Sequence, residues 1–192
     1  IIDNAYDAGI LSFNSSIRAD NSLISNCGKN INIALGGDYF FTNCTIASYS
    51  NNFLSHKSPV LTATDIAEQN GSIISADLNA IFRNCIFWGD NNIVENEAVI
   101  SKQGSSIFNV LFDHSLYKAI DDPANSILTA VIRNSDPSFD SIDVSNKYYD
   151  FRITKNLLAP GIDQGAAIGF LKDLDDNNRI VGQPDLGCYE KQ

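Results

Sequence analysis

The stretch AIFRNCIFWGDNN, residues 80–92, reads as a short apolar strand with an Asn-Cys pair in its middle. It then breaks into Trp-Gly-Asp-Asn-Asn, which is a turn composition. The Asn-Cys pair recurs in NSLISNCGKN, residues 21–30, and in YFFTNCTIAS, residues 39–48. SIFNVLFDHS, residues 106–115, is a weaker copy without the cysteine. A strand-and-turn unit that recurs at about 20 residues is typical of a solenoid.

The repeat has neither the regular leucines of leucine-rich repeats nor a sustained helical period. We therefore expect an all-β fold, a right-handed single-stranded parallel β-helix in which each strand pairs with its counterpart one coil away. Asn side chains at the corners would then hydrogen-bond to one another in an asparagine ladder. The neighbouring Cys would point into the interior, because successive side chains of a strand face opposite ways.

The four cysteines are expected to be free and inert. Cys27, Cys44, Cys85 and Cys188 match no zinc spacing, and the chain has only two histidines. Cysteines at equivalent repeat positions act more readily as small buried hydrophobes than as a disulfide framework. No histidine lies at a matching repeat position to activate a thiolate.

Composition limits the classes of partner. The chain has 192 residues, of which 44% are hydrophobic and 19% charged, with a net charge of −10. A sizeable single core is therefore expected. The acidic balance argues against nucleic acid and anionic membrane surfaces, since both need clustered Lys and Arg. No apolar run is long enough to span a bilayer.

From about residue 135 the pattern changes to segments rich in Pro, Gly and Asp. These are DPSFD (136–140), YDFRITKNLLAPGIDQG (149–165) and DLDDNNRIVGQPDLGCYE (173–190). They resemble the closing segment of a large family of right-handed parallel β-helix proteins, common among secreted and surface proteins of Bacteroides-type bacteria. The family pattern runs approximately D-P-x-F, F-R-L, S-P-A-I-D-x-G, D-x-x-G-x-x-R and P-D-I-G-A-Y-E. This chain departs from it at Ala159-Pro160-Gly161, at Asp176 in place of Gly and at Cys188 in place of Ala.

The resemblance implies one domain, with β-helix coils over residues 1–134 and an irregular capping tail over residues 135–192. It also implies an extracellular or cell-surface location, with lipid anchoring through a region missing before Ile1 as one route. It names no activity, because the fold hosts many functions. The tail's prolines and glycines independently favour a turn-rich cap over the open end of the stack.

One stretch of the tail resembles the start of a calcium loop. Asp173, Asp175 and Asn177 stand at positions 1, 3 and 5, with Ile180 at position 8. Position 6 is Asn178 where Gly is needed, and position 12 is Pro184 where Glu is needed. A weak calcium site and an Asx-rich turn with an Asp–Arg179 contact are the two interpretations.

Candidate catalytic residues follow from the likeness to pectin lyase-like enzymes. Those use a Lys or Arg base beside a calcium-bound carboxylate cluster. Arg83, Asp113 and His114 are the main candidates here, since Arg83 and His114 fall on equivalent strands; His56, Lys57 and Lys118 are further ones. Hydrolysis would need two carboxylates at a defined separation, for which Asp113 and Asp90 are nearest.

Glycan binding without chemistry would use exposed aromatic rings for stacking. Trp88 with Asp90 is the first candidate, and Tyr39, Tyr49, Tyr117, Tyr148 and Tyr149 are others, each of which could instead belong to the core. Three functions remain open: glycan binding or adhesion by a secreted or surface protein, a polysaccharide lyase or glycoside hydrolase, and a structural stalk. An aromatic platform would favour the first, and a cluster of basic and acidic residues in a groove the second.

Overall fold

The computed structural model describes residues 1–51, 54–90, 93–179 and 182–192, and within them it has seventeen strands and no helix. Six strands form one parallel sheet: β1 (Ile2–Asp3), β3 (Leu23–Ser25), β5 (Thr45–Ser48), β10 (Ile86–Gly89), β13 (Leu116–Tyr117) and β15 (Ile132–Arg133). Seven form a second: β2 (Ala8–Asp20), β4 (Lys29–Thr42), β6 (Leu61–Thr64), β9 (Leu78–Arg83), β11 (Ala98–Ser101), β12 (Phe108–Asp113) and β14 (Ile127–Thr129). Two antiparallel hairpins complete the fold: β7 (Ile66–Gln69) with β8 (Ser72–Ser75), and β16 (Ser141–Asp143) with β17 (Tyr148–Asp150).

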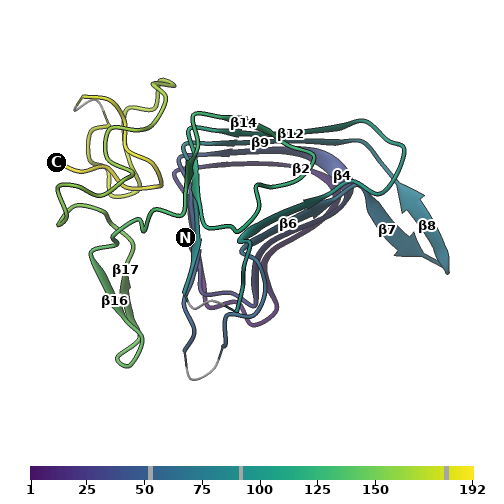
Figure 1. Cartoon of the computed structure of the whole chain (residues 1–192), viewed down its shortest axis with the longest axis horizontal. Helices are drawn as coiled ribbons and strands as arrows, with labels where there is room; N and C mark the ends of the chain where they lie inside the picture. The colour runs from purple at the N-terminus through teal and green to yellow at the C-terminus, as the bar shows by residue number, and fades with distance from the viewer. Residues whose placement is uncertain (52–53, 91–92, 180–181) are drawn as a thin grey trace.

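The seven-stranded sheet curls into a half-barrel because its long strands bend (Figure 1). The first part of β4 pairs with β6, and its last part, from Gly37 to Thr42, pairs with β9. Between the two parts, Leu35, Gly36 and Gly37 have φ of 60°, 68° and 112°. A Cβ on Gly36 would lie 2.3 Å from the carbonyl oxygen of Asp77, so glycine is required at this bend.

The prediction of a right-handed single-stranded parallel β-helix is therefore wrong, although the all-β class holds. The strands separate into a six-stranded sheet and a curled seven-stranded sheet, and the antiparallel β7–β8 hairpin interrupts the expected repeat. Asn70-Gly71, with φ of 52° and 74°, makes a tight turn that returns β8 along β7 (Figure 1). In addition, β2 and β4, of 13 and 14 residues, continue through a bend where a regular coil would end its strand.

The prediction of an asparagine ladder is also wrong. Among the described residues, one hydrogen bond joins asparagines at equivalent corners. Pairing of β2, β4, β9 and β12 makes Asn21, Asn43, Asn84 and His114 equivalent, each just past its strand, with φ of 46°, 51°, 54° and 47°. Asn84 Nδ2 donates to Asn43 Oδ1 at 2.9 Å, whereas Asn21 Oδ1 accepts from Arg179. Asn26-Cys27 follows β3, in the other sheet. The left-handed corner, rather than a ladder, is what selects Asn here.

The core lies between the two parallel sheets and confirms the prediction for the cysteines. Rings of Phe41, Phe82 and Phe112 stack at 5.5 Å and 5.0 Å between centroids. All four cysteines are free and buried. Burial, together with the neighbouring Cys44, raises the pKa of the Cys85 thiol, and burial raises the pKa of Cys188 to about 12. A raised pKa keeps the thiols of Cys85 and Cys188 protonated at neutral pH.

The C-terminal tail, residues 135–192, packs against the outer face of the six-stranded sheet (Figure 1). Leu186 contacts Ile86 and Leu116. Asn84, at the corner, exchanges two hydrogen bonds with the backbone of Ala166, at 2.9 Å and 2.8 Å. The tail therefore covers a flank of the fold with both apolar and polar contacts.

Candidate functional site

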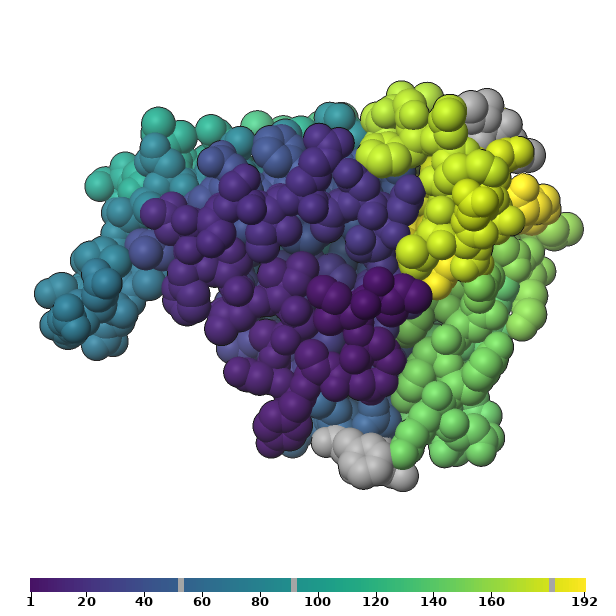
Figure 2. Space-filling view, turned by 180° about the vertical axis from the view of Figure 1, so that it is seen from behind, coloured from purple at the N-terminus to yellow at the C-terminus, as the bar shows by residue number. Residues whose placement is uncertain are grey.

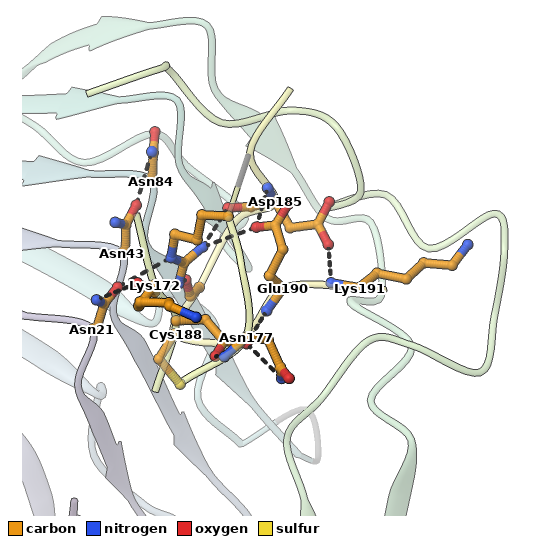
Figure 3. Close-up of polar contacts among 12 residues, drawn as sticks. Asn21, Asn43, Asn84, Lys172, Asn177, Asp185, Cys188, Glu190 and Lys191 are labelled. Carbon is orange, nitrogen blue, oxygen red and sulfur yellow. Dashed lines mark hydrogen bonds and ion pairs between the residues drawn. The ribbon is translucent and has the colours of Figure 1, made fainter. Parts of the chain in front are cut away.

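A buried polar cluster anchors the tail to the sheet corner. The guanidinium of Arg179 is 1% exposed and forms an ion pair with Glu190 at 3.2 Å. It also donates to the carbonyl of Gly187 at 2.8 Å and to Asn21 Oδ1 at 3.2 Å. Figure 3 shows Asn43 and Asn84 in line on one side of this cluster, with Asp185 and Glu190 of the tail opposite. Because its groups are bonded to one another, we assign the cluster a structural role.

The cluster contains more buried carboxylates than cations, and this affects the pKa of Glu190. Burial raises the pKa of Glu190 to about 7, and the charge of Asp185 adds to the rise, while a hydrogen bond from the Asp185 N–H and the charge of Arg179 oppose it. Burial also raises the pKa of Asp185. Arg179 thus lies in the field of three buried carboxylates, and it forms its ion pair with Glu190. The other two are Asp173 and Asp185.

This predicts that stability falls as pH rises from about 5 to about 7. Folding raises the pKa of Glu190 from 4.5 to about 7, so the folded state holds a proton that the unfolded state has released. Stability from this group is complete below pH 4.5 and is lost as pH rises through 7. At 1.36 kcal/mol per unit the loss is roughly 3 kcal/mol. Urea unfolding at four pH values should show this slope in the wild type but a flatter profile in Glu190→Gln.

Glu68→Gln on the exposed β7 is the matched control, and it should keep the wild-type slope. An unchanged slope in Glu190→Gln would show that another group dominates the pH dependence.

In the stretch that resembles a calcium loop, the carboxylates bond to groups of the chain itself. Asp173 Oδ1 accepts the N–H of Asp175 at 2.9 Å and of Asn177 at 2.8 Å, and its Oδ2 accepts that of Glu190 at 2.8 Å. Asp175 instead pairs with Arg152 at 2.7 Å. The stretch is thus an Asx-rich turn, although Arg179 pairs with Glu190 rather than with an Asp side chain. Ile180 lies outside the described residues, in which no group of three or more potential metal-ligating side chains is found.

Arg83, Asp113 and His114 come together on the outer face of the seven-stranded sheet. Arg83 Nε lies 2.6 Å from Asp113 Oδ2, and His114 Nδ1 lies 2.7 Å from Asp113 Oδ1. Partial burial acts to raise the pKa of Asp113, but hydrogen bonds from His114 and Arg83 outweigh it and lower the pKa. Asp113 is therefore held ionised, and its Oδ1 orients the ring of His114. A carboxylate in this state can serve as a base but not as a proton donor.

The other catalytic candidates do not join this cluster. Ser115, next to His114, is fully buried and donates to the carbonyl of Phe82, so it is not placed as a nucleophile. Asp90 accepts the N–H of Ser50 at 2.7 Å, past the end of β10 in the other sheet. His56 is buried against Glu97 at 2.9 Å, and Lys118 donates to the carbonyl of Gly89. Lys57 is exposed on the loop between β5 and β6.

Most of the aromatic candidates pack against other side chains and are not exposed on the surface, where a ligand could stack on them. Trp88 is half-buried against the cluster of Ile86, Leu116 and Leu186. Tyr39 and Tyr117 are fully buried in the core. Tyr49 lies among Phe139, Tyr149 and Phe151. Tyr148 is exposed, and Tyr149 lines a pocket.

We call the pocket that Tyr149 lines the tyrosine pocket. It has a volume of about 360 Å³ and is lined by Asn4, Tyr6, Asn51, Leu54, Lys147 and Tyr149. Tyr6 is 87% exposed. The ring of Tyr149 stacks on Phe151, with 6.2 Å between centroids and 9° between planes. Figure 2 shows the N-terminal residues, in purple, beside the region of the β16–β17 hairpin, in light green.

Local turns hold the walls of the tyrosine pocket. Asn4 and Lys147 have φ of 57° and 55°, in the left-handed region that turns require. Asn51 Oδ1 accepts the N–H of Leu54 at 2.9 Å, and Asp143 Oδ1 accepts that of Asn146 at 2.9 Å. These hydrogen bonds lie at, or next to, the residues that line the pocket.

Tyr149 supplies the polar end of the pocket. Its hydroxyl is buried and makes no hydrogen bond of normal geometry within the described chain, although the Asn51 amide lies near enough to lower its pKa. Burial is the largest influence and raises the pKa of Tyr149, and the charges of Asp3, Asp90 and Asp143 add to that rise. The phenol of Tyr149 and the amide of Asn51 therefore lie close together in the wall of the pocket.

Comparison with models of protein families, with curated proteins and with solved structures finds no match. The resemblance to secreted Bacteroides-type proteins therefore stays a prediction. No helix in the described part of the chain is long and apolar enough to cross a membrane.

Proposed function

We propose that the protein binds glycans through the tyrosine pocket without altering them. The observation that carries this is the exposed Tyr6 facing a pocket that also holds Tyr149, two asparagine amides and Lys147. Aromatic faces pack on the apolar faces of sugar rings, and amides both donate to and accept from hydroxyl groups. Such a role implies that the protein works outside the cell or on its surface, where polysaccharides are met.

A lyase or hydrolase at Arg83, Asp113 and His114 is the second candidate. Convergence of the three side chains favours it, since an ionised carboxylate that orients a histidine is a common base arrangement. Against it, the pKa of Asp113 is lowered, because hydrogen bonds from His114 and Arg83 outweigh its partial burial, and Asp90 is bonded elsewhere. Asp113 is thus unsuited to donate a proton, and Asp90 is not placed beside it as the second carboxylate.

Native gels that contain plant and host polysaccharides should retard the wild-type protein for at least one polymer. Tyr6→Ala should weaken binding of that polymer at least about tenfold, since it removes the exposed stacking face. Because Tyr6 is exposed, the substitution should leave the fold intact. Tyr148→Ala is the matched control, because Tyr148 is also exposed, at 57%, and lies next to Tyr149 on β17, but does not line the pocket.

The same mixtures should release no new reducing ends and no unsaturated uronides. Products that vanish in His114→Ala would establish the enzymatic candidate and overturn the non-catalytic proposal. Absence of both retardation and products on every polymer would leave a structural stalk as the best account.

A further inference from the structure

Carboxylates dominate the charges around the tyrosine pocket. Asp3 accepts hydrogen bonds from Ser25 Oγ at 2.7 Å and Asn26 Nδ2 at 3.2 Å. Asp90 is bonded to Ser50 through its Oδ2 and Oδ1, at 2.7 Å and 3.3 Å. These hydrogen bonds hold the two side chains in place. Both charges are therefore fixed in position beside the pocket.

Asp143 is the third carboxylate, at the turn of the β16–β17 hairpin. Its two oxygens accept the N–H and the side-chain amide of Asn146, at 2.9 Å and 2.8 Å. These hydrogen bonds lower the pKa of Asp143. All three carboxylates lie next to the lining: Asp3 precedes Asn4, Asp90 is bonded to the residue before Asn51, and Asp143 is bonded to the residue before Lys147. Consistent with this, each acts to raise the pKa of the Tyr149 phenol.

The lining supplies little to offset these charges. Lys147 is the single cationic side chain among the lining residues that the structure describes, and it is exposed. None of the described lining residues is an arginine, whose guanidinium binds carboxylates and sulfates through two parallel hydrogen bonds. Its other polar groups are amides and phenols, which suit uncharged hydroxyl groups. The net charge of the whole chain, −10, acts in the same sense.

We infer that the tyrosine pocket takes uncharged glycans and discriminates against polyanionic ones, such as polymers that carry uronate or sulfate groups. This rests on the proposed function and narrows its ligand class. A chain of negative sugars would bring its charges against three fixed carboxylates with one ammonium to compensate. The repulsion is exposed to solvent, so salt should screen it.

The test uses pairs of polymers that differ in charge alone. Each neutral polysaccharide that retards the protein is compared with its C6-oxidised form, in which primary hydroxyls have become carboxylates. We expect the oxidised form to bind at least about tenfold more weakly at 20 mM salt, and the difference to shrink to about threefold or less at 0.5 M salt, where the Debye length is only a few ångströms. This comparison in the wild type needs no folded variant.

Variants then locate the effect. Asp3→Asn and Asp143→Asn together should improve binding of the oxidised polymer several-fold and change binding of the neutral one little. Asp122→Asn, at an exposed ion pair with Arg133, is the control and should change neither.

The outcomes separate the inference from the function on which it rests. Equal or tighter binding of the oxidised form, lost in Tyr6→Ala, would overturn the charge discrimination and leave glycan binding at the pocket intact. Discrimination that persists at high salt and in the double variant would also overturn it. Failure of every polymer, neutral and oxidised, to bind would overturn the proposed function itself.

Discussion

Substitution of Arg179 by alanine is expected to lower the free energy of unfolding by about 3–5 kcal/mol and to loosen the C-terminal tail. The guanidinium is 1% exposed and is the cation that faces the buried carboxylate of Glu190. Its removal leaves that carboxylate without its ion-pair partner and breaks the hydrogen bonds to Asn21 and Gly187. Glu190 must then either stay charged without a partner or take up a proton, and the oxygens of Asn21 and Gly187 lose their donor.

Urea unfolding and limited proteolysis would measure this effect. Proteolysis of Arg179→Ala should begin within residues 135–192 while the sheets remain intact. Arg133→Ala is the matched control, because it breaks an exposed ion pair with Asp122 and should cost under about 1 kcal/mol. If Arg179→Ala were as stable as Arg133→Ala, the tail would not depend on this cluster.

Gly89→Ala is expected to destabilise the protein by about 3 kcal/mol or more. A Cβ at this position would lie 2.1 Å from Glu97 Oε1 and 2.2 Å from His56 Nε2, which are far inside contact distance. His56 and Glu97 form a buried pair at 2.9 Å, and Glu97 Oε2 also accepts the N–H of Val60 at 3.3 Å. The added methyl group must therefore separate a buried ionisable pair or displace the end of β10.

Thermal unfolding of Gly89→Ala beside Gly161→Ala would isolate the steric effect. At Gly161 the new Cβ meets its nearest atom, Ile153 Cδ1, at 3.1 Å, so small side-chain shifts can accommodate it. Gly161→Ala should stay within about 1 kcal/mol of the wild type. Equal melting temperatures for the two variants would contradict the close packing described at Gly89.

The strand register was partly readable from the sequence. Aligning residues 39–48 with 80–89 places Tyr39 opposite Ala80, which is the pairing observed. Alignment of residues 21–30 by their Asn-Cys pair gives the wrong register, because Asn26-Cys27 follows a strand of the other sheet. The residue equivalent to Asn43 is Asn21. Both sheets end in left-handed corners that select Asn, so an Asn-Cys pair marks a corner without saying which one.

The regular coil failed for reasons that lie in the turns. Gly36-Gly37 lets β4 continue through a bend, and Asn70-Gly71 turns the chain back on itself. Each dipeptide is compatible with several backbone paths, and the contacts made afterwards decide among them.

The two candidate sites differ in how far the sequence alone can predict them. Arg83 and Asp113 are neighbours because adjacent parallel strands place equivalent residues side by side, which a repeat alignment can predict. Asn4, Tyr6 and Lys147 meet because the tail folds back beside the N-terminus. Nothing local in the sequence encodes that contact, and the one available signal was tyrosine beside Asn-rich turns.

Backbone amide chemical-shift mapping is the most direct test of glycan binding at the tyrosine pocket. A polymer that retards the protein would be shortened to soluble oligosaccharides and titrated into ¹⁵N-labelled protein. The account predicts shifts concentrated at Asn4, Tyr6, Asn51, Lys147 and Tyr149, with Arg83, Asp113 and His114 unmoved. Shifts that gather at Arg83, Asp113 and His114 instead, with the tyrosine pocket silent, would contradict it.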